Sequence, residues 1–268
     1  MKTLGSATMA YNAIIQDYHV IETLNCLYDL SDEIAIAFGG TDGTIELVTN
    51  WYSNLELGGP HSKRVILIAF TESEWQAQRG REKLSYFSNL AINALSTDWV
   101  FYLQADEIIG QESFPFIRQA ITFDVDGYLC ARYNLWKDPK HMLNVPQERK
   151  PCSTEVIRLA RKGTQAVGDA ESITASRVHV FGKPNDVNAI HNIAIWHMGF
   201  VRDPVKHLEK IRHMQDEIFL IDHDKKIDGM VSFEPSAWFR DEDLVSVPGE
   251  LPEYIRRWAK VRYPDLDI

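Results

Sequence analysis

Residues 98–109 read DWVFYLQADEII, and this stretch gives the strongest indication of the fold. The apolar run from Trp99 to Leu103 predicts a buried strand, and two acids, Asp106 and Glu107, follow it closely. Carboxylates at the end of a strand offer the oxygen ligands that Mg²⁺ and Mn²⁺ prefer. Adjacent acids are also common in solvated turns and helix caps, which is the more frequent outcome when only their spacing is considered.

The rest of the first half repeats this pattern of an apolar strand followed by a helix. Continuous apolar runs, without alternation, are typical of parallel strands that are covered on both faces. The segments between them have the apolar spacing of helices. The predicted strands are 3–11, 33–38, 64–70 and 98–104, and the predicted helices are 13–30, 81–96 and one capped by Thr41 or Asp42. We therefore predict an α/β fold with a mixed, mostly parallel sheet flanked by helices.

The second half of the chain has a different pattern. Residues 127–136 and 154–163 alternate in part, which predicts strands of a mixed sheet. The polar segment 137–153 contains three prolines and is predicted to be a long loop. A helix is predicted over 203–222, and a further one near the C-terminus. No change of composition marks a linker, so we predict a single domain over 1–268.

The composition disfavours several classes of function. A net charge of −10 does not suit a general polyanion binder, because Lys and Arg supply most affinity for phosphate. The three cysteines are widely spaced and match neither a disulfide framework nor a zinc site. No segment has the character of a signal peptide, and none approaches the roughly 20 apolar residues of a membrane span. We therefore expect a cytoplasmic protein without stable membrane insertion.

Polar residues follow each predicted parallel strand, where such sheets bind ligands. These residues are Tyr11-Asn12, Phe38 to Asp42, Thr71-Glu72 and Gln104 to Glu107. The loop at 39–44, GGTDGT, combines glycines that allow close backbone approach with a helix start that favours an anion. It is neither a P-loop nor a dinucleotide fingerprint, and a plain turn capped by Asp42 is the simpler interpretation.

Two histidines, His191 and His197, bracket a predicted apolar strand late in the chain. Residues six apart on a strand point to the same side. A neutral imidazole at the end of such a strand can ligate a divalent metal, although a structural histidine is the commoner case.

In their order along the chain, the motifs of residues 3–110 resemble those of a family 2 glycosyltransferase of the GT-A fold. Tyr11-Asn12 stands where the family has an Asn-Glu pair, and Gly40 to Thr44 matches the second half of its DDgStDgT loop. The segment 89–107, NLAINALSTDWVFYLQADE, matches the helix and strand that lead to the family's DAD or DADE motif. WHMGFVRDPVKHLEK, residues 196–210, resembles a late histidine-containing segment of some members.

The chain departs from the family pattern at several positions. Ala13 follows Asn12 in place of a glutamate, and Ala37 and Phe38 stand where the family has paired aspartates. Gln104 replaces the first aspartate of the DAD motif, whereas Asp106, the usual metal ligand, is retained. A glutamine could still hydrogen-bond a ribose or sugar hydroxyl.

The resemblance implies a metal-dependent, inverting glycosyltransferase, either a hexosyl- or a pentosyltransferase, with a nucleotide diphosphate sugar as donor and Mn²⁺ or Mg²⁺ as cofactor. It implies a nucleotide-sugar-binding half, 1–110, and an acceptor-side half, 111–268, with C-terminal helices. Asp106 and His197 are the expected metal ligands. The expected donor-binding residues are Tyr11, Asn12, Phe38, Asp42, Lys83, Gln104, Ala105 and Asp106. Asp169 is the first candidate for the general base on the acceptor, and Glu171 is the second.

Two alternatives remain open at this point. A nucleotidyltransferase would use a similar sheet, although such enzymes usually carry a glycine-rich loop where this chain reads MAYNAIIQD, residues 9–17. A non-catalytic nucleotide-sugar-binding module would explain the acids missing at Ala37, Phe38 and Gln104. No pattern identifies the acceptor, which could be a glycan or a nucleic-acid base, or the oligomeric state.

Overall fold

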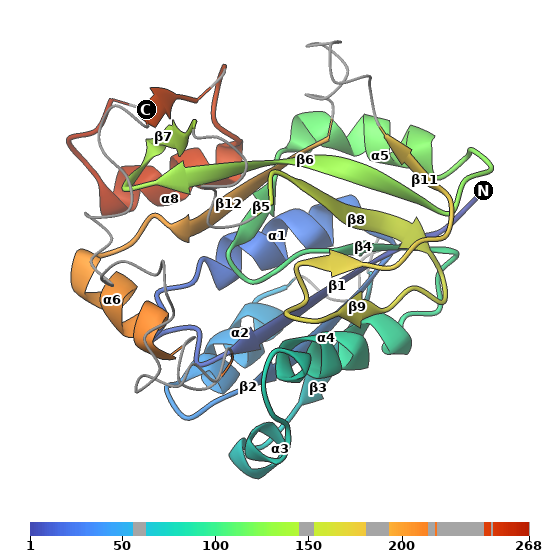
Figure 1. Cartoon of the computed structure of the whole chain (residues 1–268), viewed down its shortest axis with the longest axis horizontal. Coiled ribbons are helices and arrows are strands. Elements are labelled where there is room, and N and C mark those ends of the chain that lie inside the picture. The colour runs from blue at the N-terminus through green and yellow to red at the C-terminus, as the bar shows by residue number, and fades with distance from the viewer. Residues whose placement is uncertain are drawn as a thin grey trace, which may run out of the picture.

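The structure of the protein is a computed structural model (Figure 1). It describes residues 1–55, 63–144, 153–180, 193–213, 218, 244–247 and 249–267. The strands are β1 (Leu4–Tyr11), β2 (Glu33–Gly39), β3 (Arg64–Ala69), β4 (Trp99–Tyr102), β5 (Glu107–Ile109), β6 (Gly127–Trp136), β7 (Asp138–Leu143), β8 (Glu155–Arg161), β9 (Ala166–Val167), β10 (Ser172–Ile173), β11 (Val178–Val180), β12 (Ala194–Phe200) and β13 (Leu244–Ser246). The helices are α1 (Val20–Leu30), α2 (Thr44–Ser53), α3 (Glu72–Ala77), α4 (Glu82–Ala94), the 3-10 turn η1 (Gln111–Ser113), α5 (Phe114–Ala120), α6 (Pro204–His213) and α8 (Glu253–Arg262).

One large mixed sheet crosses the whole molecule, in the order β13-β7-β6-β8-β4-β1-β2-β3. The four strands of the first half, β3, β2, β1 and β4, are mutually parallel. The sheet then continues through β8, which is antiparallel to β4, into the strands of the second half. The predicted α/β class with a mixed sheet flanked by helices is confirmed; three parallel pairs lie in the first half, and β6 pairs parallel with β11 and β12 in the second.

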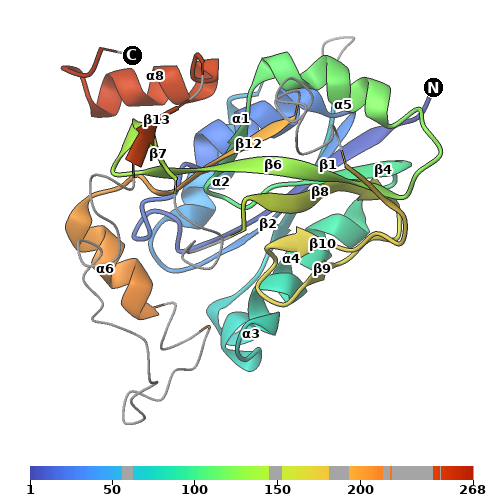
Figure 2. The same ribbon diagram turned by 45° about the horizontal axis from the view of Figure 1, so that its top comes forward.

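Alternate residues of the central strands enter two different cores, which explains why these strands are apolar throughout. On β2, Ile34 and Ile36 join the core beneath α1 and α2, whereas Ala35 and Ala37 join the core beneath α4. Figure 2 shows α1 and α5 on one side of the sheet and α3 and α4 on the other. Both helical layers therefore cover the strands whose ends carry the polar residues.

The late strand β12 fixes the geometry of the candidate site. It pairs with β5 antiparallel and with β6 parallel, so it joins the segment after β4 to the second half. In this register His197 lies opposite Glu107 on one neighbour and opposite Asn134 on the other. Helix α6 follows β12 directly, and both views place it at the same end of the molecule as α8 (Figures 1 and 2).

Three local predictions were wrong. The helix predicted over 13–30 begins only at Val20, because Asn12 and Asp17 have positive φ angles of 45° and 53° and shape a turn instead. Residues 138–143 form β7 within the predicted loop 137–153, since they pair with both β6 and β13. Helix α2 begins at Thr44, after Gly43 with φ 95°, so neither Thr41 nor Asp42 is its N-cap.

Candidate functional site

Asp106 lies in the turn between β4 and β5, at the carboxyl end of the parallel strands. The strand ends at Tyr102, and the chain turns through residues 103–106 before β5. The backbone carbonyl of Asp106 accepts a hydrogen bond from Met198 N at 2.8 Å, which ties this turn to β12. Only 5% of Asp106 is exposed. The carboxylate is therefore held inside the protein, against the late segment of the chain.

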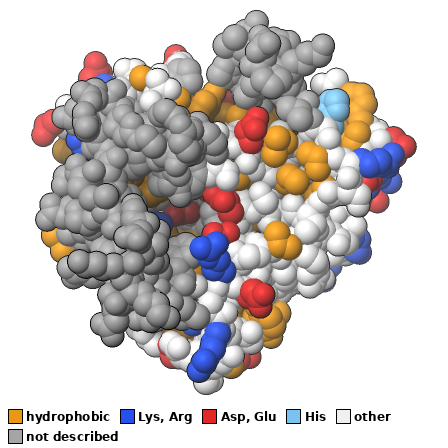
Figure 3. All heavy atoms as spheres, in the orientation of Figure 1, with side chains coloured by type: hydrophobic (Ala, Val, Ile, Leu, Met, Phe, Trp, Pro, Cys, Tyr) orange, Lys and Arg blue, Asp and Glu red, His pale blue; other side chains and the backbone are white. Residues whose placement is uncertain are grey.

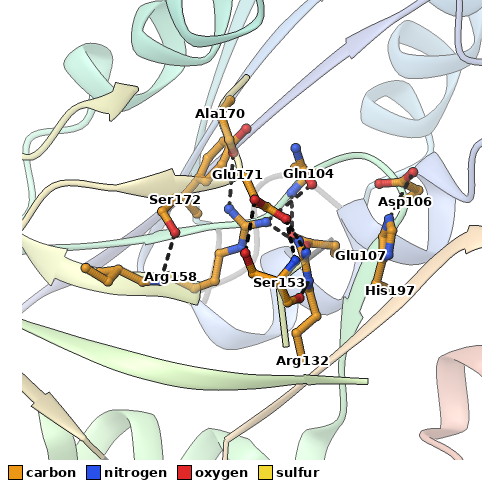
Figure 4. A network of polar contacts seen from close by, with 12 residues as sticks. Gln104, Asp106, Glu107, Arg132, Ser153, Arg158, Ala170, Glu171, Ser172 and His197 are labelled. Atoms are coloured by element: carbon orange, nitrogen blue, oxygen red, sulfur yellow. Dashed lines mark hydrogen bonds and ion pairs between the residues drawn. The ribbon is translucent and has the colours of Figure 1, made fainter. Parts of the chain in front are cut away.

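His197 faces this carboxylate from β12, with 3.6 Å between Nε2 and Asp106 Oδ2 (Figure 4). Its Nδ1 lies 2.9 Å from Asn134 Oδ1, and because that oxygen can only accept, Nδ1 carries the hydrogen. Burial lowers the pKa of His197, which favours the neutral ring, and Asp106 opposes the shift. A neutral ring with Nδ1 protonated presents the lone pair of Nε2 toward Asp106.

Gly199 lies against the same two side chains. A Cβ at this position would come within 2.8 Å of Asp106 Oδ2 and closer still to His197 Nε2. A side chain would therefore occupy the space beside the carboxylate and the imidazole. The glycine is required there by close approach of the backbone.

Two cations also reach Asp106. Lys210 Nζ on α6 lies 3.0 Å from Asp106 Oδ2, and Arg202 Nη2 lies 3.9 Å from the same oxygen. Burial alone would raise the pKa of Asp106, but Lys210, His197 and Arg202 outweigh it and hold the pKa well below its ordinary value. Acidic and basic side chains also lie next to one another near the middle of the face shown in Figure 3.

The residues present fit a divalent cation only in part. Within the described residues, no group of three or more His, Cys, Asp or Glu side chains could hold a metal ion. Asp106 and His197 offer one oxygen and one nitrogen at a separation that a single ion can bridge. Mg²⁺ is commonly bound by one or two protein carboxylates together with water and substrate phosphates. The pair is therefore suited to an ion that arrives with a phosphate ligand.

Glu107 has a different environment from its neighbour Asp106. It is fully buried, and its carboxylate contacts Arg158 Nη2 at 2.6 Å and Arg132 Nη1 at 3.3 Å (Figure 4). Its second oxygen accepts a hydrogen bond from Gln104 N at 3.0 Å. Both guanidinium groups are themselves almost fully buried. Glu107 therefore holds the turn and the second half together, and its carboxylate does not belong to the pair formed by Asp106 and His197.

The two remaining residues of the QADE turn are placed differently from each other. Gln104 is half-buried, and its side-chain oxygen accepts a hydrogen bond from Arg158 Nη2 at 3.4 Å. Ala105 is buried in the core, and its carbonyl accepts from Thr23 Oγ1 at 3.1 Å. Of these two residues, Gln104 is the one with a polar side chain at this edge of the sheet.

Asn12 and Asp42 connect the two loops that follow β1 and β2. Asn12 Oδ1 accepts from Thr41 N at 2.8 Å. Asp42 accepts from Ile15 N at 2.8 Å and from Thr44 Oγ1 at 2.6 Å. Both side chains are thus engaged in fixing loop geometry, which accounts for their position after the strands.

Tyr11 and Phe38 lie on opposite faces of the sheet. Tyr11 stacks on Trp75, with 3.7 Å between ring centroids, and its hydroxyl donates to Glu72 Oε2 at 2.7 Å. Lys83 is 3% exposed, with its Nζ 4.8 Å from the centroid of the Trp75 ring. Phe38 is 3% exposed and packs in the core beneath α1 and α2. Phe38 therefore contributes to the core, and its expected role in donor binding stays a prediction.

The two candidate bases, Asp169 and Glu171, lie in the turn that joins β9 to β10. Glu171 is ion-paired with Arg132 and accepts from Ser153 N at 2.9 Å. Burial would raise the pKa of Glu171, but Arg132 and Ser153 outweigh it and lower the pKa. Asp169 is half-buried, and its carboxylate has no hydrogen bond or ion pair within the described part of the chain.

Several residues that complete this site are not indicated by any pattern in the sequence. Asn134 is one of them, because nothing local to β6 indicates that its amide will meet His197. Lys210 and Gly199 are two more, although both fall in the segment 196–210 that resembles a late histidine-containing segment. The predicted partner His191 lies outside the described residues.

No protein-family model matches the chain, and no curated protein matches it. Among solved structures it is similar to S. aureus TarS 1–349 in complex with UDP-GlcNAc, at 15% identity and a TM-score of 0.45, over 81% of this chain and 66% of that one. The same protein in complex with UDP gives 15% identity and a TM-score of 0.44, over 79% of this chain and 64% of that one.

A mannosyltransferase from Pyrobaculum calidifontis, PcManGT, in complex with GDP-Man and Mn²⁺, matches at 14% identity and a TM-score of 0.39. That match covers 69% of this chain and 58% of the mannosyltransferase. The chain thus spans somewhat less than two thirds of both of these proteins. Because the identities and TM-scores are low, the residues of this chain have to carry the functional assignment. Among the described residues, no helix combines the length and apolar character needed to cross a membrane.

Proposed function

We propose that this protein is a metal-dependent, inverting glycosyltransferase that uses a nucleotide diphosphate sugar as donor. The observation that carries the proposal is the pair formed by Asp106 and His197 at the carboxyl edge of the parallel strands. Asn134 fixes the imidazole so that Nε2 faces the carboxylate. This arrangement of a carboxylate, a neutral imidazole and an orienting partner is typical of a divalent-metal site.

In this proposal Asp106 and His197 would hold Mn²⁺ or Mg²⁺. When bound, the ion would supply charge stabilisation for the nucleoside diphosphate, which leaves when the bond between the sugar's anomeric carbon and the diphosphate breaks. Asn134 keeps Nδ1 of His197 protonated, and Gly199 leaves room beside both ligands. The protein thereby presents a fixed pair of ligands and leaves the remaining coordination positions to water and phosphate oxygens.

The same edge of the sheet has polar groups suited to the rest of the donor. Gln104 is half-buried there, and its amide can hydrogen-bond a ribose or sugar hydroxyl. Tyr11, at the end of β1, is the second proposed donor contact; 7% of it is exposed, whereas the Trp75 and Phe70 rings stacked on it are buried. These residues are the proposed determinants of donor preference.

Asp169 is the proposed general base, because its carboxylate is not committed to another group in the described part of the chain. Glu171 is engaged by Arg132 and Ser153, and its lowered pKa makes it a weaker proton acceptor. Asp169→Asn should lower kcat by roughly 10²-fold or more and leave donor affinity unchanged. A variant with unchanged kcat would remove Asp169 from this role.

A thermal-shift panel of nucleotide sugars and nucleoside diphosphates, with and without Mn²⁺, tests the proposal directly. A ligand that binds only the folded protein raises its melting temperature. We expect one nucleotide class to raise it in the presence of Mn²⁺, and Asp106→Asn to remove that response. If no nucleotide diphosphate shifts the melting temperature under either condition, the proposed function is wrong. Binding without hydrolysis or transfer of the donor would instead identify a non-catalytic binding module.

A further inference from the structure

The surroundings of Asp106 contain more positive charge than a free metal site would favour. Lys210 Nζ is 3.0 Å from Asp106 Oδ2, where it forms an ion pair, and only 16% of the lysine side chain is exposed. Arg202 Nη2 is 3.9 Å from the same oxygen, and the arginine side chain is fully buried. One carboxylate therefore faces two cations. A divalent ion that approaches Asp106 alone must enter against both of them.

Arg202 has hydrogen-bonding capacity that the described residues leave unused. Its Nη1 donates to the carbonyl of Gln16, but Nε and Nη2 have no hydrogen-bond partner within the described part of the chain. The residue is only 5% exposed. Buried guanidinium donors are costly unless they are paired, and a phosphate is one of the ligands that their geometry suits best.

The ring of Tyr18, in the turn that follows β1, contacts both cations. The ring centroid lies 4.7 Å from Lys210 Nζ and 5.3 Å from the Arg202 guanidinium carbon. The lysine and the arginine therefore converge on one place, although they come from α6 and from the segment that precedes it. A long flexible lysine can exchange partners there without movement of the backbone.

We propose that Lys210 and Arg202 are exchangeable counterions, which neutralise Asp106 in the free protein and pass to the donor diphosphate when a divalent ion takes Asp106. This rests on the proposed function, which supplies the diphosphate. The local net charge is then the same in both states, because the two positive charges of the metal ion cancel the two negative charges of the diphosphate in a nucleotide sugar. In the free protein the two cations shield the carboxylate, and in the complex the phosphates replace it as their partner.

Such an exchange makes the binding of metal and of diphosphate mutually dependent. The diphosphate draws the cations away from Asp106 and so favours the metal, and the metal releases the cations for the phosphates. By thermodynamic linkage, each ligand must raise the affinity of the other by the same factor. The metal alone should bind weakly, because it competes with Lys210 for one oxygen atom.

Lys210→Met tests this exchange, because methionine keeps an unbranched side chain of similar length and removes the charge. We expect Mn²⁺ alone, titrated by electron paramagnetic resonance of the free ion, to bind the variant roughly tenfold more tightly than it binds the wild type. We expect UDP, GDP and inorganic pyrophosphate, each titrated in EDTA by calorimetry, to bind the variant roughly tenfold more weakly than they bind the wild type. These opposite changes would not arise from a general loss of structure.

Lys206→Met is the matched control. Lys206 lies one helical turn earlier on α6, where it pairs with Asp17 at 3.7 Å, and it carries the same charge. Both affinities should remain close to those of the wild type in this variant. Arg202→Lys should weaken diphosphate binding without strengthening Mn²⁺ binding, because the charge remains and the fork of donors is lost.

Two results would overturn the exchange. One is an affinity for Mn²⁺ alone that is unchanged or lower in Lys210→Met. The other is a diphosphate affinity that Lys210→Met leaves at the wild-type value. Failure of the proposed function gives a different result, because then no nucleoside diphosphate binds the wild type with or without Mn²⁺. The titration of Mn²⁺ alone still decides whether Lys210 competes with the metal ion for Asp106.

Discussion

Glu107→Gln should destabilise the whole fold, although the residue is adjacent to the proposed metal ligand. The carboxylate of Glu107 is fully buried between Arg132 and Arg158, at 3.3 Å and 2.6 Å. Glutamine keeps the shape of the side chain but removes its charge. Arg158 is then left with no anionic partner among the described residues, while Arg132 retains Glu171.

The magnitude follows from the burial of the network. Removing one partner of a buried ion pair typically costs about 3–5 kcal/mol of unfolding free energy, because a charge remains in the interior without compensation. For a chain of this size each kcal/mol lowers Tm by about 2–4 °C, so the expected decrease is roughly 6–20 °C. Urea unfolding followed by circular dichroism, together with a thermal melt, measures both quantities.

Glu253→Gln is the matched control for this experiment. Glu253 on α8 also bridges two arginines, Arg257 at 2.7 Å and Arg256 at 2.9 Å, but at the protein surface. Exposed ion pairs contribute little to stability, so this variant should melt close to the wild type. If Glu107→Gln melts no lower than Glu253→Gln, burial of the network does not determine its contribution, and the reasoning is refuted.

Three further predictions follow from single contacts. Asn134→Ala should weaken Mn²⁺ binding in the presence of nucleotide by about 10- to 100-fold, because His197 loses the partner that orients it. Calorimetry measures this affinity, and an unchanged value would contradict the role of Asn134 in orienting a metal ligand. Gly199→Ala should abolish the Mn²⁺-dependent thermal shift, since the new methyl group would lie 2.8 Å from Asp106 Oδ2; a retained shift would show that the site has room to adjust. Burial lowers the pKa of His19 from 6.5 to about 3, so the unfolded chain binds a proton in this interval and the folded chain does not. Stability should therefore fall as the pH decreases from 6.5 toward 3, and His19→Leu should reduce this loss of stability. Urea unfolding midpoints measured at several pH values test this, and a dependence on pH equal to that of the wild type would assign the effect to other groups.

Much of the fold could be predicted because its signals are local. The apolar runs that form β1, β2, β3 and β4 were recognisable, since each strand is buried on both faces. The errors came where backbone conformation or pairing partners overrode the local pattern. Residues 13–19 have helical spacing but turn at Asp17, and residues 138–143 look polar and proline-containing but are paired by two other strands.

The candidate site was predicted in part. Asp106 and His197 were both expected, and the structure places them 3.6 Å apart. Their proposed role as metal ligands stays a prediction. Asp106 and Glu107 appeared equivalent in the sequence, yet one lies in a turn beside a histidine and the other begins a strand between two buried arginines.

The sequence by itself determined where the candidate site lies, because the carboxyl ends of parallel strands share one edge of a sheet and the polar residues after each strand can be read directly. Only the tertiary structure decided which groups meet there. Asn134, Arg202 and Lys210 reach Asp106 and His197 through the pairing of β12 with β5 and β6 and the placement of α6. Contacts between segments so distant along the chain depend on strand register and packing, which no local pattern of residue types encodes.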